Sequence, residues 1–67
     1  MIKDIKQYDE VRFATNRFAR DGATVGSLGY VLALYSDGGF EVEVSDPKTG
    51  ETLALVVTRR DDLTISD

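Results

Sequence analysis

Residues 25–44 read Val-Gly-Ser-Leu-Gly-Tyr-Val-Leu-Ala-Leu-Tyr-Ser-Asp-Gly-Gly-Phe-Glu-Val-Glu-Val, and this stretch decides the fold. It consists of an apolar segment at 27–35, a turn at 36–39 and a second apolar segment that starts at residue 40. Ser-Asp-Gly-Gly supplies residues that tolerate the positive φ angles of tight hairpins. The stretch therefore predicts a β-hairpin and a very small all-β domain.

The segment that follows the turn alternates strictly between apolar and acidic side chains. Because successive side chains of a strand point to opposite faces, Phe40, Val42 and Val44 are expected to face a core. By the same alternation, Glu41 and Glu43 are expected to face water. These two carboxylates share a face and form the first candidate functional surface.

Gly29 interrupts the first strand of the hairpin and predicts a bulge or a sharp bend. Beyond this glycine both faces of the strand are apolar. This pattern indicates either that a bulge shifts the register within the strand or that something covers the second face.

The rest of the chain adds three short strands and few other elements. Strands are predicted at 9–14, 52–58 and 63–65, a long early loop at 15–24, a turn at 46–50 and a single helical turn at 59–62. Phe18 is the only large apolar residue of the long loop, so it is expected to pack back onto the core. Five short strands in this order predict an all-β, five-stranded SH3-like barrel formed by one domain, residues 1–67.

Five motifs occur in order along the chain. They are Asp-Glu-Val at 9–11, Gly22, Val-Gly-Ser-Leu-Gly-Tyr-Val at 25–31, Tyr-Ser-Asp-Gly at 35–38 and Phe-Glu-Val-Glu-Val at 40–44. Their order resembles a bacterial family of very small SH3-like proteins, catalogued as domain of unknown function 4926. The chain departs from the family at Tyr30, where threonine is usual. The resemblance implies a barrel without catalytic residues, encoded near small toxin-like or stress-related partners.

Composition limits the chemistry available to the chain. It has 67 residues, no cysteine, no histidine and a net charge of −4. A disulfide and a zinc site of the usual Cys/His kind are therefore excluded. Without histidine and cysteine, the general-base and nucleophile roles of an enzyme would fall to less suited side chains. Glu41 and Glu43 could serve as paired carboxylates, but their alternation with apolar residues is that of solvated residues on the outer face of a strand. Asp46, Asp61 and Asp62 lack the spacing of a calcium loop and suit turns better. We expect no enzyme, no cofactor and no metal.

Two functions from different classes remain. The first is a protein-binding module, such as an antitoxin, an immunity-type inhibitor or an accessory subunit, since an acidic surface can block a basic partner. Its candidate contacts are Glu41, Glu43, Glu51, Tyr30 and Tyr35. Whether the two tyrosines cap the core or lie on the surface stays open at this point. A homodimer is a further possibility, because the apolar run at 53–57 can form either a barrel wall or a dimer seam.

The alternative function is nucleic-acid binding, as in KOW-type barrels. The first 20 residues carry five basic and three acidic side chains, whereas residues 21–67 carry three basic and nine acidic ones. The candidate contacts are therefore in the basic early part of the chain: Arg12, Arg17, Arg20 and Phe18. The acidic balance of the whole chain disfavours binding to phosphate backbones.

The sequence also bears on location. The N-terminus is charged and lacks the apolar core of a signal peptide, and no apolar run approaches the length of a membrane span. We expect a cytoplasmic protein without membrane contact.

Overall fold

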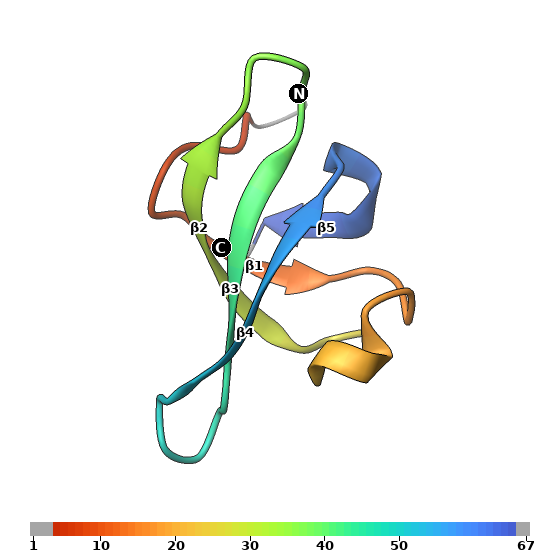
Figure 1. The fold of residues 1–67 in the computed structure, drawn as a ribbon, viewed down its shortest axis with the longest axis vertical. Coiled ribbons are helices and arrows are strands. Elements are labelled where there is room, and N and C mark those ends of the chain that lie inside the picture. Colours follow the sequence, from red (N-terminus) through yellow and green to blue (C-terminus); the bar gives the residue numbers. More distant parts are fainter. Residues whose placement is uncertain (1–3, 66–67) are drawn as a thin grey trace.

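The computed structural model describes residues 4–65 and contains one antiparallel sheet with two single 3₁₀ turns (Figure 1). The elements are β1 (Glu10–Phe13), η1 (Ala19–Asp21), β2 (Leu28–Leu34), β3 (Phe40–Ser45), β4 (Thr52–Thr58), η2 (Arg60–Asp62) and β5 (Leu63–Ile65). The strand order is β4-β3-β2-β1-β5. This arrangement confirms the predicted all-β class and the single helical turn before the last strand.

The sheet is open along its hydrogen-bonded ladder. Its two edges are β4 and β5, and within residues 4–65 no pairing joins them. β5 instead pairs with β1, with Phe13 opposite Leu63. The five strands are therefore confirmed, whereas the predicted closure into a barrel is not.

The β2–β3 hairpin forms around the predicted Ser-Asp-Gly-Gly turn. The Tyr35 N–H donates to the Gly39 carbonyl at 2.8 Å, and Gly38 adopts a φ of 91°. The Asp37 carboxylate accepts a hydrogen bond from the Gly39 N–H at 3.0 Å, which fixes the turn. The left-handed conformation at residue 38 explains why the sequence has glycine there.

β2 contains a bulge, but not at Gly29. The register shifts between Val31 and Ala33, so Leu32 is the extra residue. Gly29 is required for another reason: a Cβ there would lie 2.7 Å from Val42 Cγ1 and 3.1 Å from Phe13 Cε1. The glycine lets β2 cross close to the core, and the register shift occurs three residues later.

The core lies on the inner face of the sheet. Its largest fully buried side chains are those of Val11, Phe13, Val31, Val42, Val44 and Thr58. Phe18, from the long loop, is also buried, and its ring meets that of Phe13 edge-to-face at a centroid distance of 5.7 Å. The expected packing of Phe18 onto the core is therefore confirmed. Phe40 is only partly buried and packs at the margin of this core.

Candidate functional site

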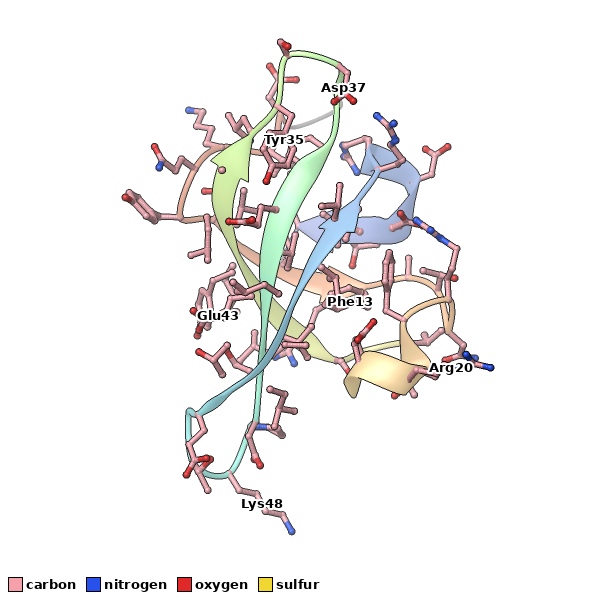
Figure 2. The ribbon with its side chains drawn as sticks, in the orientation of Figure 1. Phe13, Arg20, Tyr35, Asp37, Glu43 and Lys48 are labelled. Carbon is pink, nitrogen blue, oxygen red and sulfur yellow. The ribbon has the colours of Figure 1, made fainter. Side chains whose placement is uncertain are left out.

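The outer face of the sheet brings together most of the predicted contact residues. Tyr30 on β2 lies opposite Glu43 on β3, and Glu43 in turn lies opposite Leu55 on β4. Figure 2 shows Glu43 on the side of the sheet away from the core residue Phe13. We call Glu41 and Glu43 the acidic row. This surface is built by three neighbouring strands, so its side chains rest on a rigid support.

Both carboxylates of the acidic row are half-buried rather than fully exposed to water. Glu41 accepts a hydrogen bond from the Tyr35 hydroxyl at 3.1 Å, and Glu43 accepts one from the Ser45 hydroxyl at 3.3 Å. The Tyr35 side chain lies on the surface, with 42% of its area exposed, whereas Tyr30 is half-buried. These contacts limit the freedom of the carboxylates and leave acceptor positions for an incoming donor.

The surroundings of Tyr35 raise the pKa of its phenol. Its hydrogen bond to Glu41, partial burial and the negative charges of Glu41 and Asp37 all raise the pKa of the phenol above 10.0. The hydroxyl therefore remains protonated and donates to Glu41.

Glu51 lies apart from the acidic row. It precedes β4 at the far end of the β3–β4 hairpin and is exposed, and its carbonyl accepts a hydrogen bond from the Asp46 N–H at 2.8 Å. Figure 2 shows this hairpin end at Lys48, opposite the end that carries Asp37. The structure thus groups Tyr30, Glu41 and Glu43, adds Tyr35 through its hydrogen bond, and separates Glu51 from them.

The four residues of the nucleic-acid alternative have different surroundings. Phe18 is buried in the core, and Arg17 lies over its ring at 4.4 Å while pairing with Asp62 at 2.5 Å. Arg12 is exposed and donates to the Gly26 carbonyl at 3.3 Å. Arg20, in η1, is also exposed (Figure 2). Since Phe18 is packed inside, its ring is not available for stacking on a base.

Sequence reasoning missed the role of Asp62. This buried residue accepts hydrogen bonds from Arg17 and, at 2.8 Å, from the Arg59 backbone N–H. Its carboxylate thereby joins η2 to a loop residue 45 positions earlier in the chain. No local motif marks such a contact, because the partners come together only in the folded chain.

The environment of Asp62 gives stability a pH dependence. Burial opposes ionisation, but the hydrogen bonds from Arg17 and Arg59 and their positive charges outweigh it, so the pKa lies below its ordinary value of 3.8. Because the folded pKa is depressed, this contribution is fully present above the ordinary value and is lost as pH falls through the folded pKa.

Asp62→Asn is expected to lower the free energy of unfolding at neutral pH by about 2 kcal/mol, because charged hydrogen bonds are lost at a buried position. As the pH falls below about 4, the variant should also lose less stability than the parent protein does. Urea titrations across this pH range measure both effects, with the exposed neighbour Asp61→Asn as control. Equal behaviour of the two variants would contradict the assignment.

Neither a pocket nor a metal-binding cluster is found in the described part of the chain. Among residues 4–65, no helix has the length and apolar character needed to cross a bilayer. No protein-family model matches this chain, and no similar protein was found among curated sequences or solved structures. The resemblance to the small bacterial family therefore stays a prediction.

Proposed function

We propose that this chain is a small, non-catalytic protein-binding module that presents the outer face of β2, β3 and β4 to a basic partner. The observation that carries this proposal is the acidic row, held on the central part of the sheet beside two tyrosines. Tyrosine is enriched at binding hot spots because its ring and hydroxyl combine apolar area with a hydrogen-bonding group.

Charge indicates the chemistry of the partner. The chain carries a net charge of −4, and Asp37 lies beside Tyr35 close enough to influence its pKa. Arginine and lysine side chains on the partner would donate to Glu41 and Glu43, whose half-buried positions strengthen such contacts. A basic protein surface is favoured over a nucleic acid, since phosphates would be repelled here.

We also propose an SH3-like fold and a cytoplasmic role as an inhibitor or an accessory subunit. The strand order β4-β3-β2-β1-β5, with β2 shared between β1 and β3, supports an SH3-like arrangement. With the resemblance to the small bacterial family, it supports an inhibitor of antitoxin or immunity type, or an accessory subunit, acting in the cytoplasm. The nucleic-acid alternative has less support, because Arg17 pairs with Asp62 and Phe18 is buried.

The proposal is tested with a short peptide of alternating arginine and leucine as the basic probe. The double variant Glu41→Lys/Glu43→Lys is expected to bind it about tenfold more weakly at low salt, with a smaller difference at high salt. Isothermal titration at several salt concentrations measures this change.

The matched control is Asp4→Lys/Asp21→Lys, which makes the same change in net charge at two exposed positions outside the strands β2, β3 and β4. This control should retain most of the affinity. If both double variants lose affinity equally, only net charge acts and the proposed site is wrong. Unchanged affinity in both would also overturn it.

A further inference from the structure

β4 is an edge strand with an unusually apolar outer surface. Leu53, Leu55 and Val57 expose 50%, 56% and 57% of their area, while the intervening Val56 is buried. We call these three exposed residues the apolar row. Edge strands normally carry charges or are covered, because exposed apolar edges promote association. The apolar row is therefore a surface that a contact with another molecule would stabilise.

The charges at the two ends of β4 are opposite. Glu51 precedes the strand and Arg59 follows it, each four residues from Leu55. If two copies of β4 run antiparallel about a two-fold axis beside Leu55, Leu53 of each copy meets Val57 of the other. The same arrangement brings Glu51 of each copy toward Arg59 of the other. A parallel arrangement would instead bring like charges together at both ends.

The contacts that Arg59 makes within one chain leave it able to pair with Glu51 of a second copy. Its guanidinium donates to the Asp37 carbonyl at 3.1 Å and lies 3.7 Å from the Asp37 carboxylate. Both side chains are more than half exposed, with 59% and 69% of their areas accessible. An exposed ion pair of this kind contributes little, so Arg59 can turn to a second partner at small cost.

We propose that the apolar row binds the apolar row of a second copy of this chain, with the two β4 strands antiparallel and Leu55 at the centre. η1 flanks the first part of β4, where Leu53 reaches Gly22, so the contact is made by outward side chains rather than by a full backbone ladder. Such a contact is isologous: the same patch serves both copies.

The contact is small, so we expect a concentration-dependent equilibrium rather than an obligate dimer. The acidic row lies beside the apolar row on the same face of the sheet, with Glu43 opposite Leu55 and Glu41 opposite Val57. The self-association goes beyond the proposed function and would compete with the basic partner for this face. Sedimentation tests the dimer and peptide titration tests the partner, so the failure of one proposal can be told from the failure of the other.

Sedimentation equilibrium from micromolar to near-millimolar concentration tests this proposal. The parent chain is expected to shift from monomer to dimer, and Leu55→Lys should weaken association by at least about tenfold. The matched control is Val25→Lys, at an exposed apolar residue in a loop outside β4. A chain that stays monomeric throughout, or a dimer that survives Leu55→Lys, would overturn the proposal.

The charged ends permit a sharper test. Glu51→Arg alone and Arg59→Glu alone should each weaken self-association, because each places like charges opposite one another. A mixture of the two variants should associate about as well as the parent chain, since opposite charges then meet at both ends. Failure of the mixture to regain affinity would contradict the antiparallel register.

Discussion

Gly29→Ala is expected to lower the free energy of unfolding by about 2–3 kcal/mol, which corresponds to a fall of about 10 °C or more in Tm for a chain of this size. A Cβ at this position would lie 2.7 Å from Val42 Cγ1 and 3.1 Å from both the Glu43 carbonyl and Phe13 Cε1. Val42 is fully buried and the carbonyl belongs to β3, which is paired on both sides, so neither neighbour can move freely.

The matched control is Gly39→Ala. Gly39 is also buried, but the nearest atom to a Cβ there would be a carboxylate oxygen of the exposed Asp37 side chain, at 3.2 Å. This exposed side chain needs to shift by only a few tenths of an ångström, so a much smaller loss is expected. Thermal unfolding followed by circular dichroism measures both variants. A Gly29→Ala variant as stable as Gly39→Ala would show that β2 does not pass as close to the core as described.

Phe13→Ala is expected to leave the chain largely unfolded at 25 °C. Phe13 is the largest of the fully buried side chains, and it packs against Phe18 from the long loop. Truncating a buried phenylalanine costs about 3–5 kcal/mol, and a core of this size rarely supplies more than about 3–5 kcal/mol in total. The substitution is therefore expected to remove nearly all of the free energy of unfolding.

Phe13→Leu is the conservative control, because it keeps most of the apolar volume and loses only the ring contact with Phe18. This variant should stay folded with a reduced midpoint in urea. A Phe13→Ala protein with a cooperative transition near that of the parent chain would contradict the central role given to this residue.

Alternation and turn chemistry were sufficient to predict the hairpins. Phe40–Ser45 forms the strand that the sequence predicts, because local side-chain periodicity and the burial of one face agree there. Thr52–Thr58 is predicted instead by its apolar run after a turn. The short strand Leu63–Ile65 was also predictable, since an apolar pair after a turn has few other uses in so small a chain.

The bulge illustrates what periodicity alone cannot distinguish. Glycine in a strand is typical both of a bulge and of a close approach between backbones, and Gly29 serves the second purpose. The actual register shift lies at Leu32, where no unusual residue marks it. The two apolar faces beyond Gly29 indicate either a shift within the strand or a covered face, and they do not indicate where a shift would lie.

The candidate site was predictable in part. The shared face of Glu41 and Glu43 follows from alternation along the strand. The register that aligns Tyr30 with Glu43 depends instead on the bulge at Leu32, and the hydrogen bond from Tyr35 to Glu41 depends on how the strand ends are placed. The pairing of Arg17 with Asp62 links distant parts of the chain, so a basic loop residue in the sequence becomes part of a structural ion pair.

The outer face of the sheet carries two kinds of surface on neighbouring strands. The acidic row lies on β3, which has a paired strand on each side, and the apolar row lies on the edge strand β4. Charge on a rigid strand that is paired on both sides suits recognition of a basic partner, while apolar residues at an edge suit self-association. The proposals for the two rows can therefore be tested by separate substitutions.

The most direct test of the central claim is a titration of the ¹⁵N-labelled chain with the arginine–leucine peptide, followed by backbone amide chemical shifts. Saturable shifts are expected at Tyr30, Glu41, Glu43 and their strand neighbours. Shifts concentrated around Arg12 and Arg20, or the absence of any saturable shift, would contradict the claim that the outer face of the sheet is a protein-binding surface.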